Sequence, residues 1–141
     1  MRLTDDRTGI EVLSTDDCQA LLESQQVGRL AVISNQEPQI FPVNYAMDGP
    51  NVLIRTAGGT KLDGSLRATR VAFEIDGIDE QTAAGWSVVV RGRADEVLRA
   101  SERERLAGLG LRPWADGPKD NWVLIRPERV TGRRVGRGSG P

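Results

Sequence analysis

The sequence predicts a mainly β fold in which six or seven antiparallel strands form a closed or nearly closed barrel, with two or three short peripheral helices. Three observations lead to this prediction. After Gly28 the apolar residues leave helical spacing and fall into short runs typical of strands. Turn-forming pairs such as Asp48-Gly49 separate these runs. Most connections are too short for parallel crossovers, so neighbouring strands are expected to run antiparallel.

The first expected element is a helix in residues 13–28. Ser14 can cap it, and Asp16 and Asp17 follow in the first turn, where the helix dipole favours acidic side chains. The single cysteine, Cys18, lies on the apolar face of this helix. It is therefore expected to be a small core residue, and one cysteine allows no internal disulfide.

A three-stranded meander is expected next. Its strands cover residues 29–34, 39–47 and 52–56. Pro42 lies inside the second strand and cannot donate a ladder hydrogen bond. It therefore marks a sheet edge, a bulge or a place where the backbone has another use.

The second half of the chain continues the same pattern. The expected elements are a helix at residues 60–68, strands at 70–79 and 85–98, a helix capped by Ser101 over 101–110, and a closing segment at 121–135. Gly92 inside its strand indicates a bulge or a close backbone approach. Pro127 either breaks the closing segment into two strands or interrupts one.

The 141 residues suit one domain, which we assign to residues 1–135 with a flexible tail at 136–141. A net charge of −1 and the lack of a long apolar segment predict a cytoplasmic protein that binds neither nucleic acid nor membranes. The chain has no histidine, which removes histidine-based acid–base chemistry, histidine-activated nucleophiles and most zinc sites. No metal site is expected.

A glycine-rich turn, "IRTAGGTK" at residues 54–61, directly follows the third expected strand. Its lysine is one of two in the chain, against 17 arginines. Glycines let backbone N–H groups approach an anion, and the arginine, threonines and lysine add donors that suit phosphate. The spacing matches neither the P-loop nor the G-x-G-x-x-G pattern. On these residues alone, a phosphate site and a solvated strand-to-helix turn both remain open.

Several segments occur in a specific joint order: "PVNY", "DG", "RTAGGTK", "GWSVVVRG" and a closing W-x-x-I-x-P-x-x-V-T-G-R-R. In this order the chain, from about residue 10 to 135, resembles the pyridoxamine 5′-phosphate oxidase-like family of flavin-binding split β-barrels. The resemblance implies a homodimer that holds FMN in a cleft between two barrels. It also implies that the cofactor performs the redox chemistry on a small-molecule substrate.

The resemblance also implies where the flavin lies. The "PVNY" strand would run its backbone along the isoalloxazine ring, and the glycine-rich turn would hold the phosphate. A later strand and the closing segment would also approach the flavin, the closing segment across the dimer. The implied cofactor-binding residues are Val43, Asn44, Tyr45, Arg55, Thr56, Thr60, Lys61, Trp86, Ser87 and Arg133.

The chain departs from the true oxidase, which uses a histidine in binding its vitamin substrate, so pyridoxamine phosphate oxidation is not expected. Three alternatives remain open. The first is an FMN-dependent oxidoreductase with an unknown small substrate, and the second is a reductase that uses the deazaflavin coenzyme. The third is a non-catalytic flavin- or haem-binding protein, although the absence of histidine disfavours haem. No catalytic residue is assigned.

Other conspicuous side chains have simpler expected roles. Trp122 is expected in the barrel or dimer core, and Trp114 is a candidate to cover a substrate pocket. Glu74 and Asp76, on the polar face of their strand, are expected to face solvent.

Overall fold

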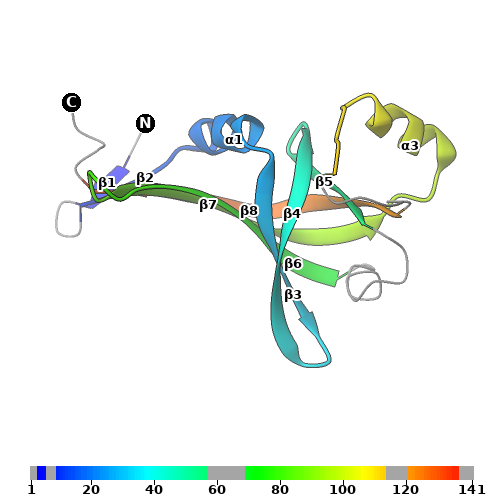
Figure 1. Ribbon diagram of the computed structural model, residues 1–141, viewed down its shortest axis with the longest axis horizontal. Coiled ribbons are helices and arrows are strands. Elements are labelled where there is room, and N and C mark those ends of the chain that lie inside the picture. Colours follow the sequence, from blue (N-terminus) through cyan, green and yellow to red (C-terminus); the bar gives the residue numbers. More distant parts are fainter. Residues whose placement is uncertain (1–2, 6–8, 57–68, 114–120, 137–141) are drawn as a thin grey trace.

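The computed structural model describes residues 3–5, 9–56, 69–113 and 121–136, which hold eight strands and two helices (Figure 1). The strands are β1 (Leu3–Asp5), β2 (Ile10–Val12), β3 (Val27–Ser34), β4 (Glu37–Asp48), β5 (Asn51–Thr56), β6 (Thr69–Asp79), β7 (Ala84–Glu96) and β8 (Asn121–Val135). The helices are α1 (Thr15–Ser24) and α3 (Ala100–Ala107). No helix in these ranges is both long and apolar enough to cross a membrane.

Six of the strands close into an antiparallel ring in the order β3, β6, β7, β8, β5, β4. The long strands β7 and β8 run past the ring, and β2 and β1 add to β8 at that end (Figure 1). The predicted antiparallel barrel is confirmed. β1 and β2 were not predicted, because three residues are too few to show an alternating pattern.

Alternating apolar side chains fill the barrel, and α1 extends this core over one face of β7 and β8 (Figure 1). Cys18 packs against Gly132, where a Cβ atom would lie 2.6 Å from the Cys18 Sγ. Burial, with the nearby Asp17 carboxylate, raises the pKa of the Cys18 thiol. The predicted core role of Cys18 is confirmed.

A second apolar cluster lies outside the barrel, where α3 covers the sheet. Its buried members are Leu53, Val97, Leu106 and Leu124. Trp122 packs against this cluster and is only partly buried. Trp122 therefore does not lie in the barrel core, because its strand position points outward, and the alternative of a dimer core stays a prediction.

The predicted irregularity at Gly92 is confirmed. The β7–β8 register shifts between Arg91 and Gly92, and a Cβ on Gly92 would lie 2.1 Å from the Arg126 carbonyl oxygen. Only glycine allows this close approach of two backbones. β8 continues through Pro127 as a single strand.

The helix boundaries differ from the sequence-based ones. α1 ends at Ser24 because the chain already enters β3 at Val27. α3 begins one residue before Ser101, with Arg99 at the N-cap position and no side-chain cap hydrogen bond, so the predicted Ser101 cap is wrong. The helix expected at residues 60–68 lies outside the described residues.

Candidate functional site

The first half of β4 lies at an edge of the described sheet. Residues 37–44 pair with β3, whereas pairing with β5 starts only at Tyr45. The Tyr45 N–H donates to the Gln26 carbonyl on the β3 side at 3.1 Å. Because antiparallel donors alternate, the Pro42 nitrogen faces away from β3, so the proline removes no bond from that ladder. The interpretation of Pro42 as an edge marker is confirmed.

Tyr45 uses its side chain inside the protein. Its ring is 3% exposed and packs edge-on against Phe73, with ring centroids 4.8 Å apart. Its hydroxyl donates to the Leu22 carbonyl near the end of α1 at 2.6 Å. Burial raises the pKa of the Tyr45 phenol well above its usual range. The Tyr45 side chain is therefore not available to a ligand.

Val43 and Asn44, the two residues before Tyr45, point to opposite faces of the sheet. Val43 packs against the barrel core, and Asn44 alternates to the outside. A groove of about 620 Å³ lies beside this part of β4. The end of α1, residues 44–47 of β4 and residues 109–112 after α3 line it.

Thr56 is the last residue of β5. Like Val52 and Ile54, it points to the inner face of the strand. It is 5% exposed, and among the described residues its Oγ1 atom has no hydrogen-bond partner. A buried hydroxyl without a partner costs about 1–3 kcal/mol. A phosphate oxygen could accept a hydrogen bond from it, so the hydroxyl fits the anion-binding role implied for it.

Arg55 points to the other face of β5. Its guanidinium carbon lies 4.4 Å from the centre of the Trp122 ring. This arrangement is a cation–π contact at the edge of the α3 cluster. The structure therefore separates the Arg55 and Thr56 side chains, as strand alternation requires. Thr60, Lys61 and Trp114 lie outside the described residues.

Trp86 and Ser87 are also on opposite faces. Trp86 packs against the barrel core and lies over Gly77. A Cβ atom on Gly77 would lie 2.5 Å from the indole Nε1 of Trp86. Ser87 faces outward opposite Arg133 on β8, at a shallow pocket of about 270 Å³. The structure thus brings Ser87 and Arg133 together.

Two carboxyl groups line the same pocket as Ser87 and Arg133. Glu74 and Asp76 share the Arg29 guanidinium, at 3.4 Å and 3.1 Å, and their side chains are 32% and 27% exposed. Burial, followed by the adjacent Asp76, raises the pKa of Glu74 to about 7 despite Arg29. Both therefore lie on the outward polar face as expected, but they are only partly exposed because the pairing of β3 with β6 places Arg29 beside them.

The implied flavin residues form two groups in one chain. Val43 to Tyr45 lie on β4, and Ser87 and Arg133 lie on β7 and β8. Neither β7 nor β8 pairs with β4: β5 lies between β4 and β8, and β3 and β6 lie between β4 and β7. The two groups therefore lie on strands that are not neighbours in the sheet.

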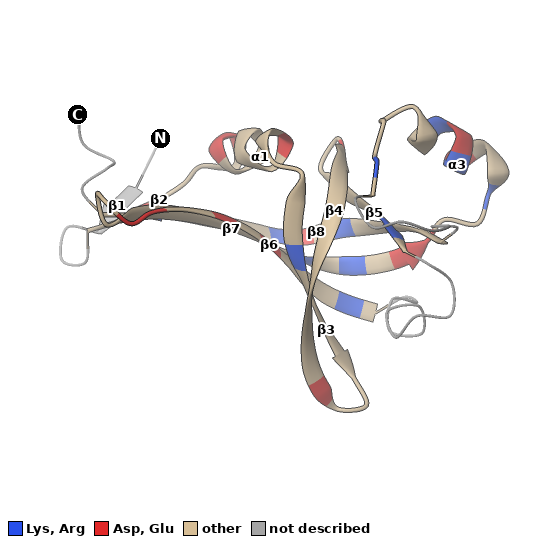
Figure 2. Cartoon of the chain, viewed as in Figure 1, with Lys and Arg blue, Asp and Glu red and all other residues tan. Residues whose placement is uncertain are grey.

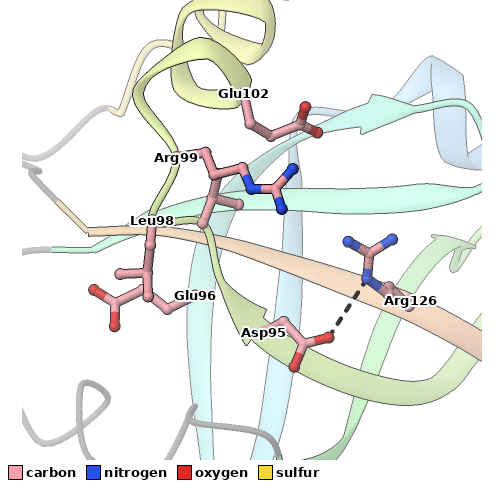
Figure 3. A pocket seen from close by; sticks show the side chains of 7 residues that line it. Asp95, Glu96, Leu98, Arg99, Glu102 and Arg126 are labelled. Atoms are coloured by element: carbon pink, nitrogen blue, oxygen red, sulfur yellow. Dashed lines mark ion pairs between the residues drawn. The ribbon is translucent and has the colours of Figure 1, made fainter.

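A further groove, of about 420 Å³, lies between the end of β7 and α3 (Figure 3). Charges of both signs line it, and Asp95 pairs with Arg126 at 3.4 Å. It contains none of the implied cofactor residues. Among the described residues, no three histidine, cysteine or acidic side chains gather where they could hold a metal ion.

Known proteins are similar to this chain in sequence and in fold. The family model described as pyridoxamine 5′-phosphate oxidase matches residues 14–134. An uncharacterized protein of Mycobacterium tuberculosis, Rv0080, is 36% identical over 128 residues, which are 87% of this chain and 84% of that protein.

Two solved structures share the fold. The FAD binding protein from Mycobacterium smegmatis has a TM-score of 0.80 and 37% identity, covering 90% of this chain and 99% of that one. A FAD-binding protein from Mesorhizobium loti has a TM-score of 0.72 and 25% identity, with coverage of 90% and 99%.

Proposed function

We propose that this chain, which belongs to the pyridoxamine 5′-phosphate oxidase family, binds a flavin. The resemblance implied FMN, with the deazaflavin coenzyme as an alternative. Two relatives of similar fold are FAD-binding proteins, so we expect FAD ahead of both. The chain would then act as an oxidoreductase on a small substrate.

The observation that carries this proposal is the buried Thr56 hydroxyl at the end of β5, for which the described part of the chain offers no partner. Its position directly before the glycine-rich turn suits a phosphate group, and the resemblance assigns Thr60 and Lys61 to the same group. In this proposal Thr56 donates to a phosphate oxygen. The edge of β4 at Val43 to Tyr45 orients the ring system with its backbone.

A bound flavin supplies hydride and electron transfer, so the protein itself needs only to bind and orient its ligands. The test starts with the absorbance spectrum of the purified protein. The flavin-free protein is then titrated with FAD, FMN and the deazaflavin coenzyme, followed by flavin fluorescence. Binding of at least one, with FAD tightest, is expected. Failure of all three to bind overturns the proposal, and reduction of the bound flavin by NADH or NADPH tests the oxidoreductase assignment.

A homodimer is the second part of the proposal. Ser87 and Arg133 lie on strands that are not neighbours of β4, and the family resemblance implies that the closing segment approaches the flavin of a second copy. The outward face of β6, β7 and β8, which we call the outer face, also carries exposed apolar side chains. These are Ile78 and Val135, which are 76% and 38% exposed, and Val12 on the neighbouring β2 is 47% exposed.

Sedimentation velocity tests the dimer. Ile78→Glu introduces a charge on the outer face and is expected to give a monomer that binds flavin weakly. Leu98→Glu is the matched control, because Leu98 is 74% exposed but lies beside α3. A wild-type monomer, or equal effects of the two variants, contradicts the proposed interface.

A further inference from the structure

The groove of about 620 Å³ beside β4, which we call the α1–α3 groove, reaches β4 from the side of α1 and β3. The edge proposed for the flavin, at residues 37–44, is the opposite one, on the side of β5. None of the described residues that line the α1–α3 groove belongs to β6, β7 or β8. The groove therefore lies clear of the proposed dimer interface.

Hydrogen bonds fasten both walls of the groove to the hairpin of β4 and β5. The Tyr45 hydroxyl donates to the Leu22 carbonyl of α1 at 2.6 Å. On the other wall, the Arg105 guanidinium of α3 donates to both oxygens of the Asp48 carboxylate, at 2.8 Å and 2.9 Å. The Leu109 N–H donates back to the last turn of α3 at 3.0 Å. The groove is therefore largely preformed, as small-molecule sites usually are.

Met47 presents an unpaired main-chain donor and acceptor to the groove. The Tyr45 N–H points to the β3 side, where it donates to the Gln26 carbonyl. Because this direction alternates along a strand, the Met47 N–H and C=O point to the same side. The pairing of β3 with β4 begins only at Val27 opposite Asn44, so no strand lies beside Met47 there. In the described part of the chain, neither group has a hydrogen-bond partner.

This open edge is one residue long. On one side of Met47 the Tyr45 N–H is already used, and on the other the Gly49 carbonyl accepts from Gln19 Nε2 at 2.8 Å. A peptide that adds a strand needs several open residues. One residue can instead exchange two hydrogen bonds with a single partner, as in an antiparallel pair. A cyclic amide carries its N–H and C=O on one edge, so it suits Met47 better than a peptide does.

The rest of the lining favours a neutral ligand with an apolar body. Apolar and amide side chains line the groove: Leu109, Leu111, Gln25 and Gln26. Figure 2 shows acidic residues on α1 and residues of both signs on α3. Of the charged residues, however, only Glu23 and Arg112 line the groove, so its described lining carries one charge of each sign. The volume of about 620 Å³ is in the range of small-molecule sites.

We propose that the α1–α3 groove binds a small neutral molecule with a cyclic amide, which exchanges two hydrogen bonds with the Met47 main chain. The ring of this molecule packs against Leu109 and Leu111, and the side-chain amides of Gln25 and Gln26 bind its other polar groups. Because the groove uses the opposite edge of β4 from the flavin, this proposal does not depend on flavin binding.

The test is a titration of isotope-labelled protein with 2-quinolone, a bicyclic cyclic amide, followed by heteronuclear NMR. The Met47 amide signal is expected to shift until the site is saturated. N-methyl-2-quinolone lacks the N–H donor and should bind about 2- to 10-fold more weakly, as expected for one lost neutral hydrogen bond. Leu109→Glu removes apolar surface from the wall and should weaken 2-quinolone binding at least about 3-fold. The control Leu98→Glu changes an exposed leucine of the other groove beside α3 and should keep the wild-type affinity.

A Met47 signal that does not shift up to the solubility limit of 2-quinolone overturns the proposal, as do equal affinities for the two quinolones. Equal affinities of Leu109→Glu and Leu98→Glu place the ligand outside the groove and also overturn it. FAD carries cyclic amide groups in its ring system, so it is added as a competitor. FAD is expected to leave 2-quinolone bound, and displacement would show that the groove is part of the flavin site. The comparison of the two quinolones needs no variant, so it decides the matter even if Leu109→Glu is unstable.

Discussion

Thr56→Val is expected to stabilise the flavin-free protein and to weaken flavin binding. Valine has nearly the shape of threonine, so the change removes one hydroxyl without leaving a cavity. In the folded protein this hydroxyl is buried and has no partner within residues 9–56, 69–113 and 121–136, whereas water satisfies it in the unfolded chain. Without a ligand, the buried hydroxyl lowers the stability of the fold, whereas with a bound flavin it donates a hydrogen bond to the phosphate. Its removal therefore has effects of opposite sign on stability and on flavin binding.

The structure sets the size of both effects. A buried hydroxyl without a partner costs about 1–3 kcal/mol, so the free energy of unfolding of the flavin-free variant should rise by up to that amount. At this chain length, each kcal/mol corresponds to a rise of about 2–4 °C in Tm. A hydrogen bond to a charged phosphate contributes about 1.5–3 kcal/mol. Flavin affinity should therefore fall by about 10- to 150-fold.

Urea denaturation of the flavin-free proteins measures the first effect, and titration followed by flavin fluorescence measures the second. Thr82→Val, at an exposed turn position, is the control and should change neither quantity by much. A less stable Thr56→Val protein would show that the hydroxyl has a partner in the folded chain. Unchanged flavin affinity would show that the hydroxyl does not contact the cofactor. Either result refutes the reasoning.

Three further predictions concern packing and charge. Tyr45→Phe removes the 2.6 Å hydrogen bond to Leu22 and leaves a buried carbonyl without that donor, so urea denaturation should show a loss of about 1–3 kcal/mol. Gly92→Ala places a Cβ 2.1 Å from the Arg126 carbonyl oxygen, and the required backbone shift should cost about 1–3 kcal/mol or prevent soluble expression. Glu74 has its pKa raised to about 7 in the folded protein, so its contribution to stability is complete below about pH 4.5 and is lost as the pH rises towards 7. Glu74→Gln should remove this pH dependence from the midpoints of urea denaturation, and an unchanged slope between pH 5 and 8 would contradict the assignment.

The sequence predicts the faces to which several site side chains point, as well as the fold. Strand alternation at Arg55 and Thr56 already contains the information that their side chains point to opposite faces. The same period of two applies to Trp86 and Ser87. The family resemblance placed both residues of each pair near the cofactor, and the structure separates their side chains.

The environment of Glu74 could not be predicted in this way. Its raised pKa depends on burial, on Asp76 beside it and on Arg29, which precedes Glu74 by 45 residues. No local pattern connects Arg29 to this carboxyl. The register between β3 and β6 brings them together.

The sequence by itself determined the antiparallel barrel, the edge at Pro42 and the bulge at Gly92, because side-chain period and backbone freedom are local properties. Only the tertiary structure decided which side chains share a face across strands. It brought Arg29 to Glu74 and Asp76, and it buried the Thr56 hydroxyl where no other described residue is its partner. Both features depend on strand register and barrel closure, which join residues distant along the chain.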